Sequence, residues 1–319
     1  MALISLTLAA CGETDNATER FVIPPGATVG AIAETLAVNG ILRRPRLFSL
    51  YVRLKGADDD IKAGTYELAR NSGWSESLET LVAGRVVTIA VTVPEGWTLR
   101  QIAKRMAPIA GIPVDSAARR LLNPELSNSL AAPGPTLEGY LFPETYRFAP
   151  GVRLESIAGI LFERYKTAWT AARRAALDSL GMSERELITL ASIVQAEARW
   201  EEEMPLISAV YHNRLRRRMR LQADPTVQYA LGSRRSRLLF ADIESVADNP
   251  YNTYTHSGLP PGPIGAPGLA AIDAALHPAS VRYLYFVARP DGKHEFSRSL
   301  VEHNRKIQEI RRARRQTGG

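Results

Sequence analysis

The chain has 319 residues, of which 45% are hydrophobic, and this is enough for two or three domains with cores of their own. Lysine and arginine outnumber aspartate and glutamate by 40 to 33, which gives a net charge of +7. This excess suits an anionic polymer such as nucleic acid, anionic lipid or an acidic cell-wall glycan, and equally an ordinary basic surface. We expect no nucleic-acid partner, because no aromatic residues interleave with the basic clusters and no helix-turn-helix or zinc-finger spacing occurs.

The first residues carry a short apolar run. Residues 2–10 are small or apolar, about half the length that a membrane span needs. They match the apolar part of an export signal, although no lysine or arginine precedes them. The tetrapeptide LAAC at 8–11 resembles a bacterial lipobox, in which Cys11 would carry lipid. The alternatives are a shortened transmembrane anchor, a start codon further upstream, or a chance run of small residues. Because Cys11 is the single cysteine, no disulfide can form within the chain.

A repeat follows the polar linker at 12–20. Residues 21–42 match residues 91–112: each has a β-rich run, a Pro-x-Gly turn, an amphipathic helix and a Gly-Ile pair. Thr28 and Thr98 are the predicted N-caps of the two helices. The pattern predicts two small strand-turn-helix units, which contain no cluster of catalytic side chains and are therefore expected to bind or to position.

The connecting segments are predicted from the same signals. Between the repeats we expect a strand at 63–68, a helix at 75–84 that ends on glycine, and a strand at 85–93. Residues 123–135 form a candidate domain boundary. The aromatic-rich stretch 136–148 contains Glu138 and Glu144, and Pro143 argues against a helix there. A single helix is predicted over 152–176.

A central helix is predicted over residues 187–200. Ser183 and Glu186 form an S-x-x-E capping box just before it. Its apolar face consists of Leu187, Leu190, Ala191, Val194 and Ala198. Glu197 lies on the flank of that face, where loss of solvation raises the pKa of a carboxyl toward the value that a general acid needs. The alternative is a boundary glutamate that reaches water.

Polar groups then gather on two loops. The stretch 208–232 is predicted to be a helix followed by a loop, and residues 221–226 break the helix and present Gln222, Asp224 and Thr226 on a turn. The stretch 249–268 holds five prolines and four glycines, but also aromatic and amide side chains, so it is predicted to be a rigid loop that shapes a cleft. We expect a helix at 270–278, a strand at 283–288, and a short strand leading into a C-terminal helix.

The motifs exclude several chemistries. No Walker loop, dinucleotide fingerprint, H-E-x-x-H or G-x-S-x-G occurs, and the five histidines lack metal-ligand spacing. We therefore expect no metal and no cofactor. What remains is carboxylate chemistry in a cleft lined by tyrosine, asparagine and glutamine, which suits glycoside cleavage. A second carboxylate is available in Glu138, Glu144 or Asp224.

Five stretches in order, at 137–146, 190–198, 213–229, 251–264 and 283–304, together resemble the endolytic murein transglycosylase family. The stretch VPEGWTLRQIA at 93–103 is similar to a LysM module, which binds glycans that contain N-acetylglucosamine. The resemblance implies a lyase of peptidoglycan that cuts MurNAc-(β1→4)-GlcNAc bonds within nascent strands without water. The products are 1,6-anhydro-MurNAc ends, and strand elongation stops.

The family pattern also assigns residues and a location. It implies that Glu197 is catalytic. We further expect a set of cleft residues to bind sugar and peptide or to orient Glu197, namely Glu138, Tyr140, Gln222, Asp224, Thr226, Asn252 and Tyr254. The alternative for each of them is a hydrogen bond that stabilises a loop. The first acidic position of the motif is Gln195 here, which points about 160° away from Glu197 on a helix, so its loss should spare catalysis. The family is anchored in the bacterial inner membrane, faces the periplasm and associates with peptidoglycan synthases.

The predicted fold class is α+β, with two small strand-turn-helix (LysM-like) units followed by a mixed α/β catalytic domain. The predicted boundaries are an export signal or anchor remnant with its linker at 1–20, an N-terminal α/β unit at 21–88, a LysM-like unit at 89–135 and a transglycosylase domain at 136–319. Two other functions stay open: a non-catalytic glycan-binding scaffold of wall synthesis, and a hydrolase of the same bond.

Overall fold

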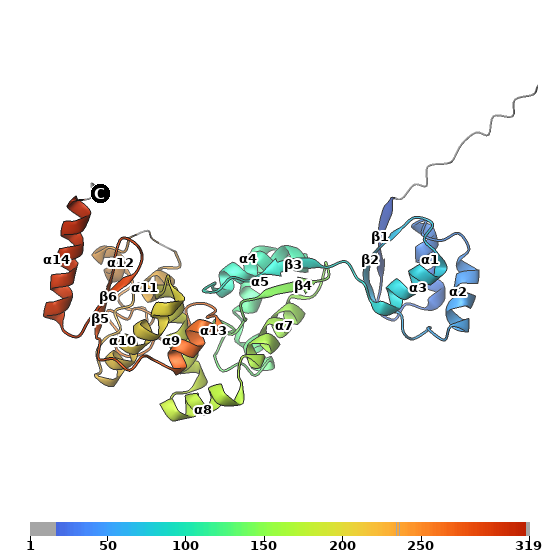
Figure 1. The fold of residues 1–319 in the computed structure, drawn as a ribbon. Coiled ribbons are helices and arrows are strands. Elements are labelled where there is room, and N and C mark those ends of the chain that lie inside the picture. The colour runs from blue at the N-terminus through green and yellow to red at the C-terminus, as the bar shows by residue number, and fades with distance from the viewer. Residues whose placement is uncertain (1–16, 234, 236, 317–319) are drawn as a thin grey trace, which may run out of the picture. The chain divides into compact units, whose positions relative to one another are not determined.

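The chain forms two compact units. The computed structural model describes residues 17–233, 235 and 237–316, so the expectations for Cys11 and the export signal lie outside the described residues. One unit consists of the chain up to Ile89 together with Arg147–Pro150, and the other of Ala90–Tyr146 and the chain from Gly151 onward (Figure 1). Helices dominate both units and the sheets are two-stranded, which confirms the predicted α+β class.

The first unit has the order strand, two helices, strand, helix. Its elements are β1 (Thr18–Ile23), α1 (Val29–Val38), α2 (Pro45–Leu54), β2 (Gly64–Ala69) and α3 (Trp74–Ala83). The two strands pair antiparallel, with Phe21 opposite Tyr66. Phe21 and Ile23 alternate inward along β1 and are buried with Leu36 of α1. As predicted, Thr28 caps α1 by accepting the Ala31 N–H.

The second unit opens with the same kind of structure. Its first elements are β3 (Ile89–Thr92), α4 (Leu99–Ala110), α5 (Val114–Leu121), α6 (Pro124–Ser129) and β4 (Thr145–Phe148), with β3 paired to β4. Thr98 is the N-cap of α4, as predicted, and it also forms a capping box with Gln101. The strand β3 is shorter than the predicted run 85–93, because the Val87 N–H already donates to the carbonyl of Thr65 in β2.

The remainder of the second unit is mostly helical. Its elements are α7 (Leu154–Thr167), α8 (Ala171–Leu180), α9 (Glu184–Glu197), η1 (Glu201–Glu203), α10 (Met204–Arg216), α11 (Asp224–Leu231), α12 (Phe240–Ser245), α13 (Leu269–Leu276), β5 (Tyr285–Ala288), β6 (His294–Ser297) and α14 (Leu300–Gln316). The prediction of one helix over 152–176 is wrong, because the chain leaves the helix after Thr167. Thr170 then caps a new one by accepting the Arg173 N–H.

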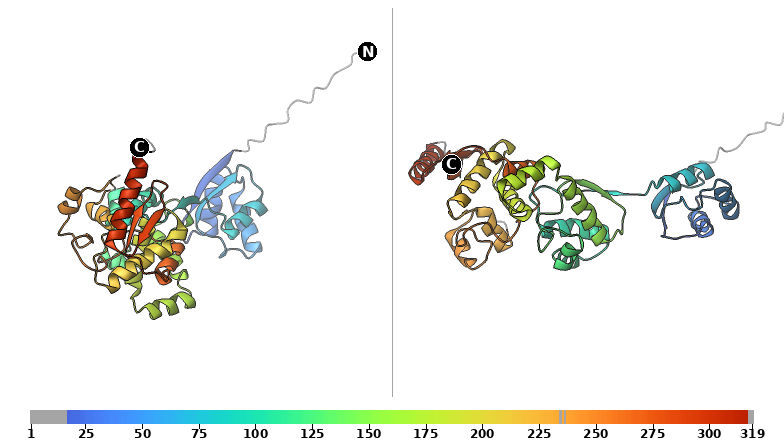
Figure 2. Two further views of the ribbon diagram at one scale, coloured as in Figure 1. Left: turned by 60° about the vertical axis from the view of Figure 1, so that its left-hand side comes forward. Right: turned by 90° about the horizontal axis from the view of Figure 1, so that it is seen from below.

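The central helix α9 is buried along most of its length. Ser183 is its N-cap and forms the predicted capping box with Glu186. Every residue from Leu187 to Val194 is buried, so the predicted apolar stripe extends around the whole middle of the helix. The causes are α10 and α13, which pack beside α9 (Figure 1; Figure 2), and the loop 249–268, whose Ile264 N–H donates to Ser192 Oγ at 3.0 Å.

No helix in the described part of the chain combines the length and the apolarity that crossing a bilayer requires.

Glu197 is the last residue of α9, and Ala198 already has an extended backbone. The helix therefore places its catalytic candidate at its C-terminal end, where the chain turns away.

Candidate active site

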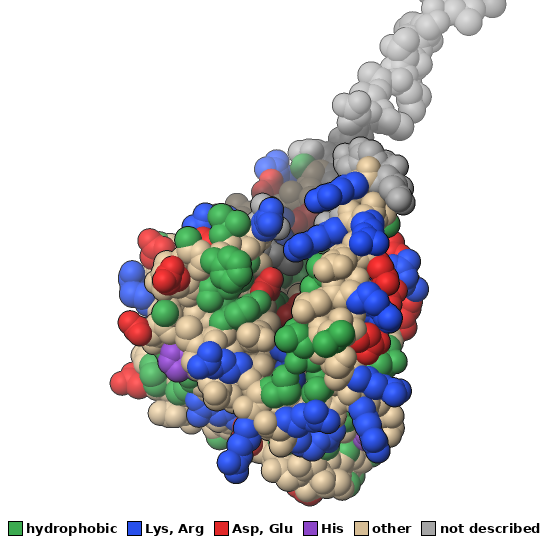
Figure 3. Space-filling model, turned by 90° about the vertical axis from the view of Figure 1, so that its left-hand side faces the viewer, with side chains coloured by type: hydrophobic (Ala, Val, Ile, Leu, Met, Phe, Trp, Pro, Cys, Tyr) green, Lys and Arg blue, Asp and Glu red, His purple; other side chains and the backbone are tan. Residues whose placement is uncertain are grey.

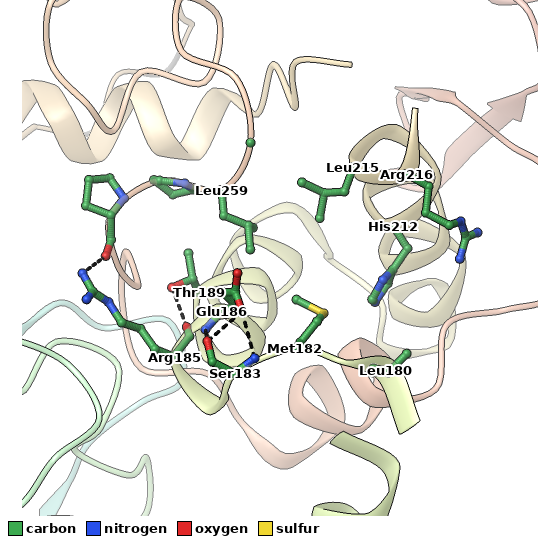
Figure 4. A pocket seen from close by; sticks show the side chains of 13 residues that line it. Leu180, Met182, Ser183, Arg185, Glu186, Thr189, His212, Leu215, Arg216 and Leu259 are labelled. Carbon is green, nitrogen blue, oxygen red and sulfur yellow. Dashed lines mark hydrogen bonds between the residues drawn. The ribbon is translucent and has the colours of Figure 1, made fainter. Parts of the chain in front are cut away.

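Two cavities lie at opposite ends of α9. The larger, of about 810 Å³, is formed by the start of α9, by α10 and by residues 258–261 (Figure 4). Its one carboxyl is Glu186, which is exposed and whose Oε2 accepts both the N–H and the hydroxyl of Ser183, at 2.8 and 2.7 Å. These bonds lower the pKa of Glu186. Glu186 is therefore a capping anion and unsuited to donate a proton.

The smaller cavity, of about 360 Å³, contains Glu197 at the C-terminal end of α9. Five further elements and two loops line it, mostly with aromatic, polar and charged side chains: Tyr211, Arg214, Leu221, Gln222, Asp224, Tyr254, Tyr285, Phe286, Ala288, His294, Leu300 and His303. Figure 3 views the side of the molecule that carries α14 and shows a hollow between two raised walls, with lysine and arginine side chains along its rim. The aromatic faces and hydrogen-bonding groups that line the Glu197 cavity suit the binding of a sugar.

Burial and a hydrogen bond compete to set the pKa of Glu197. Its Oε1 accepts the Tyr211 hydroxyl at 2.8 Å. Burial raises the pKa of Glu197 to about 7 and the nearby Asp224 raises it too, while the Tyr211 bond and the charge of Arg214 lower it. Near neutral pH a large fraction of Glu197 therefore carries a proton, as the position on the helix predicts for a general acid.

Arg214 brings a buried positive charge to the same cavity. Its Nε donates to the Leu284 carbonyl at 2.7 Å and its Nη1 to the Leu221 carbonyl at 2.6 Å. The guanidinium lies 5.3 Å from the centre of the Tyr285 ring. The charge of Arg214 also lowers the pKa of Glu197 electrostatically.

Three of the predicted substrate-binding residues line this cavity. Gln222 has a left-handed backbone (φ +46°) and its N–H donates to the Thr253 carbonyl at 3.1 Å, so the turn exposes its side chain. Asp224 opens α11 and accepts the Tyr254 hydroxyl at 2.5 Å. The predicted turn at 221–226 and the predicted cleft loop at 249–268 therefore meet beside Glu197, and the roles of these three residues stay predictions.

Thr226 and Asn252 are fully buried. Thr226 Oγ1 donates to the Ala223 carbonyl at 2.7 Å. Asn252 donates to the Ile243 carbonyl at 2.9 Å, and its Oδ1 accepts the Tyr254 N–H at 3.0 Å. In this structure the two side chains stabilise the loops and do not line the cavity. Asn252 helps to shape the cavity indirectly, because it binds the backbone of Tyr254.

Glu138 and Tyr140 do not line the Glu197 cavity, and their role as substrate-binding residues stays a prediction. Glu138 is 4% exposed and accepts the Leu99 N–H at 2.9 Å and the Tyr229 hydroxyl at 3.0 Å. Burial raises its pKa to about 7. Tyr140 is fully buried and its ring packs edge-on against Tyr165 at 5.4 Å. Both residues are therefore parts of the framework.

The remaining candidate for a second carboxyl, Glu144, forms an ion pair with Arg164 and does not line the cavity. Asp224 is consequently the one predicted second carboxyl that accompanies Glu197. Among the described residues, no group of three or more histidine, cysteine, aspartate or glutamate side chains could hold a metal ion.

Sequence reasoning missed Tyr211, Arg214 and His294. A usable signal existed for the first two: they are three residues apart on a predicted helix and so share a face. No comparable signal existed for His294, because β6 meets the end of α9 only in the folded chain.

The two neighbours of Glu197 should move its pKa in opposite directions. Replacing Tyr211 by phenylalanine removes the bond that favours the charged form, so the pKa of Glu197 should rise. Replacing Asp224 by asparagine removes a negative charge, so the pKa should fall. Carbon-13 NMR titration of the Glu197 carboxyl in both variants would measure this. Shifts of the same sign would contradict the arrangement described.

Known proteins match most of this chain. A model of the YceG-like family matches residues 21–309. An endolytic murein transglycosylase of Bacillus subtilis is 34% identical over 299 residues, 89% of this chain and 82% of that protein. One of Streptococcus pneumoniae is 30% identical over 317 residues, 90% of this chain and 57% of that protein. A crystal structure of a yceG-like protein from Listeria monocytogenes matches with a TM-score of 0.63 and 34% identity, over 91% of this chain and 99% of that one. The chain belongs to the YceG-like family.

Proposed function

We propose that the protein is an endolytic lytic transglycosylase that cleaves MurNAc-(β1→4)-GlcNAc bonds within nascent peptidoglycan strands and so ends their elongation. The observation that carries the proposal is the carboxyl of Glu197, whose pKa burial raises to about 7, in a cavity of aromatic and hydrogen-bonding side chains. The names of the relatives support the same reaction on the same polymer.

The chemistry needs one carboxyl that acts twice. Neutral Glu197 donates its proton to the glycosidic oxygen as the bond from that oxygen to C1 of MurNAc breaks. The resulting carboxylate takes the proton of the C6 hydroxyl, whose oxygen bonds to C1 and closes the 1,6-anhydro ring. One C–O bond breaks, one forms, and the proton ends on the leaving sugar, so no water is consumed.

The neighbours of Glu197 suit both halves of this cycle. The Tyr211 hydroxyl and the charge of Arg214 stabilise the carboxylate that exists between the two proton transfers. Asp224 places negative charge beside a reaction centre whose transition state is positively charged. Gln222 and Tyr254 offer polar groups for sugar hydroxyls, and Tyr285 and Phe286 offer aromatic faces.

A hydrolase of the same bond is the second candidate, and one observation favours it. Asp224 lines the cavity with Glu197, and a pair of carboxyls is what a glycosidase uses. The scaffold alternative requires instead that Glu197 has no chemical role.

Location and partners are part of the proposal. We infer from the family resemblance that the protein acts outside the cytoplasm, on the periplasmic face of the bacterial inner membrane, with peptidoglycan synthases as partners. The residues at 89–135, and by their similar order of elements those at 21–88, would be LysM-like units that hold glycan for a catalytic domain at 136–319. The anchor would be a lipid on Cys11 or a membrane segment.

Replacing Glu197 by glutamine should abolish the reaction, because the amide cannot donate the proton. Loss of general acid catalysis predicts a fall of at least about 10² to 10⁴ in the release of soluble fragments from purified peptidoglycan. Glu201→Gln is the matched control, because Glu201 is exposed and lies just beyond the C-terminal end of α9. Unchanged release by Glu197→Gln would support the scaffold instead.

Product masses separate the lyase from the hydrolase. Cleavage without water should leave anhydro-MurNAc ends, which are one water lighter than reducing ends. Mass spectrometry of fragments from a digest in ¹⁸O-labelled water should therefore find light ends without the label. Reducing ends that carry the label would establish hydrolysis.

A further inference from the structure

The wall of the Glu197 cavity carries a hydrogen-bonded pair that the mechanism above does not use. His294, on β6, lines the cavity. Its backbone N–H donates to Glu203 Oε1 at 2.9 Å, and its ring Nδ1 lies 2.9 Å from Glu203 Oε2. The side chains of the two residues are only 7% and 10% exposed. One carboxylate therefore holds this histidine by its backbone and by its ring.

The pair determines which ring nitrogen is free. A carboxylate can only accept hydrogen bonds, so the proton between Glu203 and the ring belongs to Nδ1. In the neutral imidazole this leaves Nε2 with a lone pair and no proton. The His294 ring also packs edge-on against the Phe286 ring, with the two ring centroids 5.2 Å apart. Nε2 is thus the polar atom that His294 offers to the cavity, as a hydrogen-bond acceptor.

Most other polar groups of this cavity are already engaged. The Tyr211 hydroxyl donates to Glu197, the Tyr254 hydroxyl donates to Asp224, and two nitrogens of Arg214 donate to carbonyls. A glycan presents many hydroxyl donors. An acceptor that is not a carboxylate can bind one of them without adding a negative charge near Glu197.

We propose that His294 is a substrate-positioning residue, whose Nε2 accepts a hydrogen bond from a glycan hydroxyl, and that Glu203 acts through His294 by fixing its tautomer and orientation. The inference rests on the proposed function, because it takes the cavity to be the glycan site. It adds a binding contact from β6 to those from α11 and the loop 249–268.

Glu203→Gln is the most informative variant. The amide oxygen can still accept the His294 N–H, but the amide NH₂ now faces Nδ1, which forces the ring proton onto Nε2. The acceptor becomes a donor at almost unchanged volume. We expect kcat/KM on peptidoglycan to fall by about 3- to 10-fold, the range for one neutral hydrogen bond, mainly through KM. Nitrogen-15 NMR should show the proton move from Nδ1 to Nε2.

Glu202→Gln is the matched control, since Glu202 is exposed and pairs with Lys293 instead. It should leave both the tautomer and kcat/KM unchanged. A Glu203→Gln protein with the altered tautomer and full kcat/KM would overturn the inference, as would a wild-type ring with its proton on Nε2. If Glu197→Gln abolishes activity while Glu203→Gln keeps full kcat/KM despite its altered tautomer, only this inference fails; if Glu197→Gln stays active, the proposed function fails.

A second measurement does not depend on how the Glu203 variant folds. Inactive Glu197→Gln protein can be mixed with intact glycan strands, and the nitrogen-15 resonance of His294 Nε2 followed. The inference predicts that this resonance shifts on binding while that of Nδ1 stays in place. An unchanged Nε2 resonance at saturating glycan would overturn it.

Discussion

The hydrogen bond from Tyr211 to Glu197 joins the two helices on which the site is built. Burial opposes the charged form of Glu197 and this bond favours it, so that the pKa comes to about 7. Glu197 is also the last residue of α9, where the partial negative charge of the helix end disfavours a carboxylate. A group balanced in this way can donate a proton and accept one at the same pH, which a single-carboxyl mechanism requires.

The helix α9 positions Glu197 and, with it, the groups that set its pKa. The capping box fixes the start of the helix, and 14 residues later, about 21 Å along the axis, the chain delivers Glu197. The same helix also docks the cleft loop: Ser192 accepts the Ile264 N–H, and Gln195 accepts the Gly268 N–H at 2.9 Å. Gln195 thus holds the loop, consistent with the expectation that it faces away from the reaction. One buried helix, α9, therefore positions both the proposed acid, Glu197, and the loop 249–268.

Local signals in the sequence predicted much of this. The caps at Thr28, Thr98 and Ser183 depend on a few neighbouring residues, and all three are present. The position of Glu197 beside an apolar face likewise predicted its raised pKa. The break between α7 and α8 was missed, because the apolar pattern continues across it and the cap at Thr170 went unrecognised.

Local sequence signals cannot predict contacts between segments that lie far apart in the chain. Glu138 lies in an aromatic-rich stretch that suits a sugar-binding residue. In the fold, however, one of its carboxyl oxygens accepts the Leu99 N–H and the other accepts the Tyr229 hydroxyl, and the sequence alone predicts neither hydrogen bond. Arg214 and His294 enter the cavity from α10 and β6, and the Glu203–His294 pair spans 91 residues. Burial of polar groups decided which candidates face the cavity, and burial is a property of the assembled fold.

The central claim is that a carboxyl protonated near neutral pH starts the reaction, and the pH dependence of kcat/KM on purified peptidoglycan tests it most directly. Because the free enzyme must hold the proton on Glu197, the account predicts that kcat/KM falls about tenfold per pH unit above a midpoint of about 7. A profile that stays level up to pH 9 would contradict the account.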